Sequence, residues 1–555
     1  MSEMKNRPLV GIDALGRATP LPTQTDTQKP NRLTGVFYFL WMENEKNIPV
    51  YDISKITAAD PEAGYKPDSD VWGKYSEAHY WGEPFYGYYW QGDEWVVRKH
   101  MKLLIGAGVD FLFFDTTNAV IYADKAKQVM RVLQEYHDDG FRVPQVMFYT
   151  NTRSGDTVQE IYDTVYKPQY CPDIWFCLDG KPVIIAVEEE CSAETRAFFN
   201  IKKSQWPNEP DKQGGWPWMD FTRPQRVFDD INGNPSIINV SVAQHPQERF
   251  GDQVLYGETR NCGRAYHNGQ NDPDENAYLW GYNFAEQFDR ALETAPPIVL
   301  ITGWNEWIAG RWQGPPERPI MFVDCANCEY SRDLEMMRGG YFDNYYMQLV
   351  SYVRQYKGVA SCAPTAVGEQ TTFANFTDGD IPRDAKGWVG WYENRTQRNA
   401  ITALSVSHSD AAVTFTVKTK SPIVLSEVGS FMNIFISKGE AAGFDFVINA
   451  HPDFAAKTTT VEKIRRAPAA PTPDRPCDDL TDTALVGTVP LTWDDDSITV
   501  TVPLAMLDIA PQDADFVLWL KAADSSRRFD RVDQFYEDGD CAPLGRLCYL
   551  YHGTR

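Results

Sequence analysis

The sequence lacks a long hydrophobic run and a surplus of positive charge. No stretch of 18 or more apolar residues occurs, which leaves no candidate for a membrane-spanning helix. The 53 Lys and Arg residues against 77 Asp and Glu residues give a net charge of −24. Nucleic-acid binding relies on clustered Lys and Arg that neutralise phosphates. We therefore expect neither membrane insertion nor a nucleic-acid partner.

Cysteine and histidine are also sparse. Ten cysteines are scattered through 555 residues, too few for a disulfide-built scaffold. Cys325 and Cys328 have CxxC spacing, but no second pair completes a zinc site. The histidines show no HxxxH or HxH spacing, so we expect no zinc chemistry, no catalytic metal and no cofactor. A structural calcium held by loop Asp residues stays open. The polar segment 1–17 has no signal-peptide pattern, which predicts a cytoplasmic protein, or a secreted or periplasmic one whose signal was trimmed.

What the first 350 residues do contain is an alternation of short apolar runs with helical patterns, typical of parallel strands buried on both faces. We predict strands at 35–41, 110–115, 145–149, 183–187, 216–221, 237–243, 298–302 and 320–324, with helices at 95–107, 123–136, 157–165, 279–294 and 344–356. A doubly wound open sheet would normally carry a Gly-rich phosphate turn after an early strand, and none is present. The pattern predicts an α/β protein whose catalytic domain is a (β/α)8 TIM barrel over residues 31–360.

After about residue 360 the helical periodicity fades. Segments such as 411–419 and 497–502 alternate apolar and polar residues instead, which is typical of half-buried strands. We predict a C-terminal β-sandwich domain over 361–555, a linker near 358–370 and an N-terminal extension over 1–30.

Polar residues that directly follow barrel strands are expected at the mouth of the barrel, where barrel enzymes build their active sites. The long insertions 42–94 and 245–278 add to the same face. Carboxylates, amides and aromatic residues gather at these positions, a mixture that suits sugars, because apolar ring faces stack on aromatics and hydroxyls need polar partners. We expect a carbohydrate substrate bound by Trp41, His79, Trp81, Glu83, Asp115, Asn118, Tyr149, Asn151, Gln244, His245, Trp304, Asn305, Arg311 and Glu335.

Glycoside hydrolysis normally needs two carboxyl groups that flank the bond. Glu306 is the leading candidate, because it follows the apolar run 298–302 in an aromatic setting where an idle charge would be costly. Our first choice for the general acid is Glu188, at the end of the fourth predicted strand. Asp115 and Glu335 are the alternatives.

Three segments, TGWNEWIAG (302–310), GVFYFLW (35–41) and WGEPFYGYY (81–89), resemble barrel glycoside hydrolases of families 71 and 99, over about residues 30–357. The resemblance implies a metal-independent glycosidase for mannan- or glucan-type polysaccharides. In family 99 the Glu of the first motif acts as a base on the substrate 2-hydroxyl, and a Glu three residues later is the acid/base. Glu306 matches the first position, and Ala309 stands at the second. The segment 432–449 looks like sandwich modules related to carbohydrate-binding domains.

The sequence therefore predicts a glycoside hydrolase with Glu306 as an essential carboxylate. Ala309 departs from the family pattern and keeps open a non-catalytic glycan-binding protein on a barrel scaffold. A third reading, which also follows from the resemblance, is an enzyme of surface-polysaccharide synthesis or modification. Activity on a glycoside separates the first reading from the second.

Overall fold

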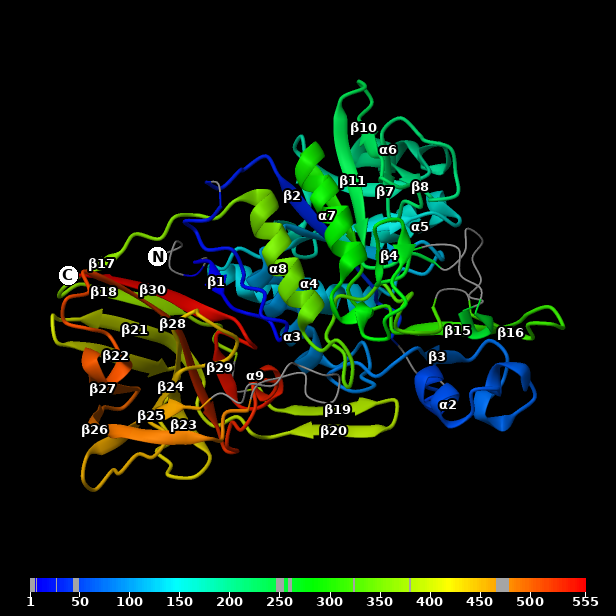
Figure 1. The fold of residues 1–555 in the computed structure, drawn as a ribbon. Helices are drawn as coiled ribbons and strands as arrows, with labels where there is room; N and C mark the ends of the chain where they lie inside the picture. Colours follow the sequence, from blue (N-terminus) through cyan, green and yellow to red (C-terminus); the bar gives the residue numbers. More distant parts are fainter. Residues whose placement is uncertain are drawn as a thin grey trace.

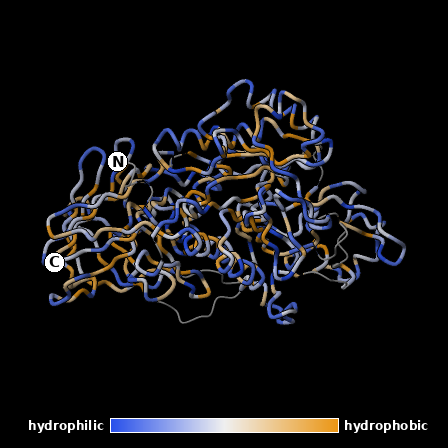
Figure 2. The backbone as a smooth tube through the Cα atoms, turned by 90° about the horizontal axis from the view of Figure 1, so that it is seen from above, coloured by the Kyte–Doolittle hydropathy of each residue, from blue (hydrophilic) through white to orange (hydrophobic). Residues whose placement is uncertain are grey.

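A computed structural model describes residues 5, 7–25, 27–42, 49–245, 254–257, 262–322, 325–378, 381–465 and 479–555. The chain forms an α/β part and a C-terminal β-rich part that lie side by side, and the C-terminus lies at the edge of the β-rich part (Figure 1). Hydrophobic segments gather in the interior of both parts (Figure 2). None of the helices in the described ranges is long and apolar enough to cross a membrane.

The α/β part is built on a parallel sheet that is nearly closed into a barrel. Its strands, in spatial order and each parallel to the next, are β11 (Pro235–Ser241), β14 (Ile298–Thr302), β2 (Leu33–Tyr38), β4 (Phe111–Thr116), β5 (Gln145–Thr150), β7 (Lys181–Ala186), β8 (Asn200–Gln205) and β9 (Gly215–Pro217). Two short antiparallel strands, β10 (Val227–Asp229) and β6 (Cys177–Leu178), pair with β11 and β7. The two edge strands β9 and β11 lie in contact, which brings the sheet close to closure.

Helices cover the outside of this sheet (Figure 1). They are α3 (Glu94–Ala107), α4 (Ala123–Asp138), α5 (Ser154–Ile161) with the π-helix η3 (Tyr162–Tyr166), α6 (Ala193–Phe198), α7 (Tyr282–Thr294) and α8 (Asn344–Lys357). Local sequence sets the ends of α3: the Asp93 side chain accepts a hydrogen bond from the backbone N–H of Val96, and Gly108 adopts a left-handed φ of 77° after the last turn. The helices predicted from periodicity are confirmed to within a few residues.

Aromatic side chains fill the interior of the parallel sheet. Phe37 of β2 stacks on Phe113 of β4 with ring centroids 4.6 Å apart, and Tyr149 of β5 packs beside both. Gly35 makes room for this packing, because a Cβ at that position would lie 2.2 Å from the Phe111 ring. The interior is a packed core, so any site for a ligand lies beyond the ends of the strands.

The prediction for the eighth strand was wrong. The described part of 320–324 is β16 (Ile320–Phe322), which pairs with β15 (Ile308–Gln313) and through it with β3 (Ala78–Tyr80) in a small antiparallel sheet outside the parallel one; residues 323 and 324 lie outside the described ranges. The parallel sheet contains β8 instead, whose sequence NIKKSQ has no apolar run. The Nζ of one of its lysines, Lys202, lies 5.7 Å from the ring centroid of Trp216, a cation–π contact.

The β-rich part is one strongly curled sheet. Its strands follow the order β1 (Leu9–Val10), β30 (Cys548–Thr554), β28 (Asp515–Ser525), β23 (Ser430–Ser437), β24 (Phe446–Ile448), β25 (Thr458–Ile464), β26 (Thr483–Trp493), β27 (Ser497–Pro503), β22 (Ala412–Thr419), β21 (Ile401–His408) and β18 (Gln370–Ala374), with β17 (Thr365–Ala366) on β30 and β29 (Asp540–Ala542) on β28. The long β26 pairs with β25 along most of its length and with β27 at its end. A hydrophobic core lies between the two halves of the sheet. The alternation at 411–419 and 497–502 corresponds to β22 and β27, and the sandwich classification stays a prediction.

Buried ion pairs join the two parts. Arg383 of the hairpin β19 (Arg383–Gly387) and β20 (Gly390–Asn394) lies 2.7 Å from Asp93, the residue that caps α3. Arg546 lies 2.7 Å from Asp343, which directly precedes α8. Such pairs fix the relative placement of the two parts, because separating them would leave buried charges without partners.

Cysteine serves neither disulfides nor metal sites in the described ranges. All nine described cysteines are free thiols, including Cys541 and Cys548. Among the described residues no group of three or more His, Cys, Asp or Glu side chains could hold a metal ion.

Candidate active site at the mouth of the barrel

Aromatic residues cap the barrel interior at the carboxyl ends of the strands. Trp41 follows β2 and stacks on Phe39 at 5.9 Å, and Trp218 follows β9. The Trp218 ring lies 5.4 Å from that of Trp206 and 5.9 Å from that of His245. Trp41 and Trp206 are half-buried. We name Trp41, Trp206 and Trp218 the aromatic floor; half-buried indole faces of this kind suit stacking against sugar rings.

Polar side chains lie among these aromatic residues. Asp115 ends the inward-facing run of β4, is 7% exposed, and accepts hydrogen bonds from the backbone N–H (3.0 Å) and hydroxyl (2.7 Å) of Thr117. Asn151, after β5, accepts a hydrogen bond from the Ser204 hydroxyl at 2.9 Å. Asn118 is exposed and donates to the Tyr122 hydroxyl at 2.8 Å. Of the predicted mouth residues, Asp115 therefore lies near the end of β4 and Asn151 directly follows β5.

Tyr149 and Gln244 use their polar atoms within the barrel. The Tyr149 hydroxyl lies 3.1 Å from the carbonyl oxygens of Gln205 and Trp216, so it links β5 to β8 and β9. Burial raises the pKa of Tyr149 well above its usual range. Gln244 is fully buried and donates to the backbone carbonyl of Asp220 at 2.5 Å. Both residues therefore hold the strand ends together.

Glu306 follows β14 and is paired with a buried arginine. Its Oε2 accepts hydrogen bonds from Arg332 Nε, at 3.0 Å, and from Arg332 Nη2. Glu306 is 5% exposed and Arg332 is 1% exposed. A guanidinium this close favours the ionised form of a carboxyl group. The geometry thus holds Glu306 as a carboxylate.

A second carboxyl group, that of Asp333, contacts the backbone of Glu306. It accepts hydrogen bonds from the backbone N–H of Glu306 and, at 3.0 Å, from Trp81 Nε1. The Trp81 ring stacks on Trp307 at 4.4 Å. Burial raises the pKa of Asp333 to about 7, although Arg264 and Arg332 oppose the shift. Asp333 thereby fixes the backbone position of Glu306.

Asn305 joins the loop that carries Glu306 to Phe39, the residue that follows β2. Its Oδ1 accepts from the Phe39 backbone N–H at 2.9 Å, and its Nδ2 donates to the Phe39 carbonyl at 3.1 Å. Trp304 is fully buried, and its backbone N–H donates to the Phe37 carbonyl at 2.8 Å. The Asn305 side chain and the Trp304 backbone thus join the loop after β14 to β2 and the residue that follows it. That both residues bind substrate stays a prediction.

Glu335 is the centre of a buried hydrogen-bond network. Its Oε2 accepts from the Tyr89 hydroxyl (2.8 Å) and from Trp307 Nε1 (2.6 Å), and its Oε1 lies 2.9 Å from His100 Nε2. The other ring nitrogen of His100 lies 3.0 Å from the Tyr38 hydroxyl. Glu335 is fully buried, so this carboxylate is satisfied by protein donors.

His79 and Glu83 of the first long loop contact mainly that loop, and Arg311 of β15 contacts it too. Both ring nitrogens of His79 face backbone carbonyls, and burial lowers its pKa to about 4, so its ring is neutral at pH 7. Arg311 donates to the Gly73 carbonyl at 2.7 Å, and Glu83 pairs with Lys55 at 2.6 Å.

Glu188 lies in the 3-10 helix η5 (Glu188–Glu190) and is exposed. Its assignment as the general acid stays a prediction.

Sequence reasoning missed Arg332, Asp333, Trp206 and Trp218. Arg332 is 26 residues from Glu306 along the chain. In the run SRDLE (331–335) only Glu335 was predicted to belong to the site. The Arg and Asp of the same run contact Glu306. Trp206 follows β8, the strand that was not predicted. Missing β8 therefore also removed Trp206 from the predicted mouth.

Comparison with known proteins gives partial structural similarity only. No family model and no curated protein matches the sequence. Two structures of a GH99 endo-alpha-mannosidase from Bacteroides thetaiotaomicron align with 60% and 59% of this chain and 98% of their own, at 16% and 15% identity and TM-scores of 0.34 and 0.35. A structure described as a glycoside hydrolase-like protein aligns with 62% of this chain and 98% of its own, at 12% identity and a TM-score of 0.33. The structures to which the chain is similar in part are thus described as glycoside hydrolases.

Proposed function

We propose that the protein is a glycoside hydrolase on a (β/α)8 TIM barrel, with Glu306 as an essential carboxylate and a carbohydrate as its substrate. The observation that carries the proposal is the Glu306–Arg332 pair at the end of β14, with Nε and Oε2 3.0 Å apart. The residues of the aromatic floor follow other strands of the same sheet, and Asp115 lies near the end of β4. A carboxylate near aromatic stacking surfaces is the combination that glycoside cleavage requires.

The ion pair assigns a role to Glu306. Because Arg332 favours the ionised form, Glu306 is suited to act as nucleophile or base and unsuited to donate a proton. Another carboxyl group must protonate the leaving oxygen. Glu188 is the acid predicted from the sequence, and Asp115, which is buried near the end of β4, is the alternative.

A specific observation supports the second candidate, a glycan-binding protein without catalysis. Ala309, at the position of the family's second Glu, lies in β15 opposite His79. Its side chain packs in an apolar cluster with Trp72 and Phe322. A carboxyl group in this cluster would be buried without a partner, so the fold of this loop disfavours the family's acid at residue 309.

The test is reducing-sugar release from a panel of mannans and glucans by the wild type and by Glu306→Gln. We expect a loss of about 100-fold or more, the contribution typical of an essential acid or base. Glu293→Gln is the matched control, because Glu293 has the same chemistry on the exposed surface of α7. Thermal unfolding of each variant shows whether Arg332, once deprived of its carboxylate, destabilises the fold.

Equal activity of wild type and Glu306→Gln would overturn the assignment. Sugar binding by both proteins with release by neither would establish the non-catalytic function. If the wild type is active, Asp115→Asn and Glu188→Gln identify the acid: the variant that loses activity on glycosides with poor leaving groups, and keeps it on those with good ones, carries the general acid.

A further inference from the structure

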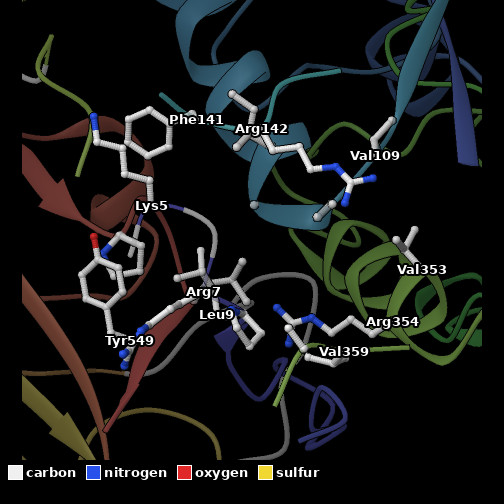
Figure 3. A pocket seen from close by; sticks show the side chains of 18 of the residues that line it. Lys5, Arg7, Leu9, Val109, Phe141, Arg142, Val353, Arg354, Val359 and Tyr549 are labelled. Carbon is white, nitrogen blue, oxygen red and sulfur yellow. The ribbon is translucent and has the colours of Figure 1, made fainter. Parts of the chain in front are cut away.

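A cavity of about 650 Å³ lies on the side of the barrel opposite Glu306, between the α/β part and the β-rich part. The last turns of α3 and α8 and residues 108–109, which precede β4, form one wall. The N-terminal segment, residues 358–363 and the stretch before β30 form the rest (Figure 3). Its volume falls within the range of small-molecule sites.

The lining of this cavity is basic in a strongly acidic protein. Among its described lining residues none is Asp or Glu, and six are basic: Lys5, Arg7, Lys102, Arg142, Arg354 and Lys357. Carboxylates outside the lining neutralise three of them. Asp378 lies 2.6 Å from Lys102, and Asp110 pairs with both Arg142 and Lys357.

Arg354 differs from those three, because no described carboxylate pairs with it. It lies in the last turn of α8, is 7% exposed, and its Nη1 has no hydrogen-bond partner among the described residues. Its side chain extends past Val359 toward the segment that carries Arg7 and Leu9 (Figure 3). The nearby Tyr346 hydroxyl donates to the Leu103 carbonyl at 3.0 Å and offers no negative charge.

Burying a guanidinium without a partner is unfavourable. Burial lowers the pKa of Arg354 to about 10, so the side chain still carries its charge at neutral pH. The cavity therefore contains a desolvated positive charge that the described protein atoms leave uncompensated. A bound anion would supply the missing partner.

We propose that this cavity binds a small organic anion, whose carboxylate or phosphate pairs with Arg354 and whose apolar part packs against Leu9, Val353 and Val359. Arginine binds both oxyanions through paired N–H donors. Because both parts of the protein line the cavity, the ligand stabilises their junction and raises the stability of the folded chain by mass action. This site is independent of Glu306 and of any glycosidase activity.

The test measures the melting temperature of the full chain in sodium butyrate, sodium phosphate and sodium chloride at equal ionic strength. We expect butyrate or phosphate to raise the melting temperature above the chloride value, and the arm that does so identifies the acid group. Arg354→Met should weaken the apparent affinity for that anion at least about tenfold, the loss expected for a charge-assisted hydrogen bond. Arg153→Met, which removes an exposed arginine directly before α5, should keep the full response.

Arg354→Met should also be at least as stable as the wild type without added anion, because it removes an unpaired buried charge. A purely structural role near the C-terminal end of α8 predicts the reverse: lower stability and an unchanged response to anions. That result would overturn the proposal, as would an equal effect of all three salts on the wild type. If Arg354→Met fails to fold, Ala360→Glu places a carboxylate in the cavity wall and should abolish the response; a full response in that variant would also refute the site.

Discussion

Replacing Glu335 by alanine tests whether this carboxyl group supports the fold or the chemistry. The substitution leaves three buried donors without an acceptor: the Tyr89 hydroxyl, Trp307 Nε1 and His100 Nε2. An unsatisfied buried donor costs about 1–3 kcal/mol. A water molecule in the vacated space would recover part of this loss. We therefore expect Glu335→Ala to lower the free energy of unfolding by about 3–5 kcal/mol, the range found for broken buried charge networks.

Glu335→Gln is the matched comparison, because it keeps the shape and one acceptor oxygen. The Gln carbonyl can still accept from Tyr89 and Trp307, which share Oε2 in the wild type. The amide N–H group then faces His100 Nε2, and His100 can accept it by moving its own proton to Nδ1, toward the Tyr38 hydroxyl. We expect a smaller loss, about 1–2 kcal/mol.

The assay is urea unfolding followed by tryptophan fluorescence, since Trp307 contacts Glu335 directly. A cost of Glu335→Ala below about 1 kcal/mol would refute the reasoning. So would equal costs for the Ala and Gln variants. A folded Glu335→Gln variant of normal stability but without glycosidase activity would instead assign Glu335 to the chemistry.

Two further predictions concern the same motif. Asn305→Ala removes both hydrogen bonds to the Phe39 backbone, so we expect about 1–3 kcal/mol of destabilisation in urea unfolding and weaker sugar release; unchanged values of both would contradict this anchoring role. The pKa of Asp333, raised by burial to about 7, exceeds the value of about 3.9 expected in the unfolded chain. Its contribution to stability is therefore fully present below about pH 4 and is lost as the pH rises through 7. The destabilisation by Asp333→Asn should accordingly be larger at pH 5 than at pH 8, and a cost independent of pH would contradict the shift.

Local sequence patterns were enough to predict most strands of the parallel sheet. Apolar runs located β2, β4, β5, β7, β11 and β14, because a strand buried on both faces leaves that signature in the sequence. The pattern failed at β8, where polar and basic residues occupy a strand and the Nζ of Lys202 lies over the Trp216 ring. The opposite error occurred at β16. This apolar run was predicted to join the parallel sheet, but it pairs with β15 outside that sheet. An apolar run predicts burial and cannot say which sheet a strand joins.

The candidate site, too, could be predicted from the sequence only in part. The position of Glu306 after an apolar strand was enough to place it beyond the end of β14. The contact that gives it a chemical character comes from Arg332, which no local pattern links to it. His79 and Arg311 were both expected at the mouth. In the structure the polar atoms of His79, in the first long loop, and of Arg311, in β15, face backbone carbonyls of that loop, a contact that local sequence does not reveal.

The sequence by itself determined the elements that depend on neighbours a few residues away: strand and helix positions, the capped ends of α3 and the change to β alternation after residue 360. Only the tertiary structure decided which charges meet. Arg332 pairs with Glu306, while Arg354, equally charged and also buried, has no described carboxylate partner beside its cavity. Periodicity is set by backbone geometry within one element. The pairing of two charges depends on how distant elements pack, and the sequence spacing between them does not encode that distance.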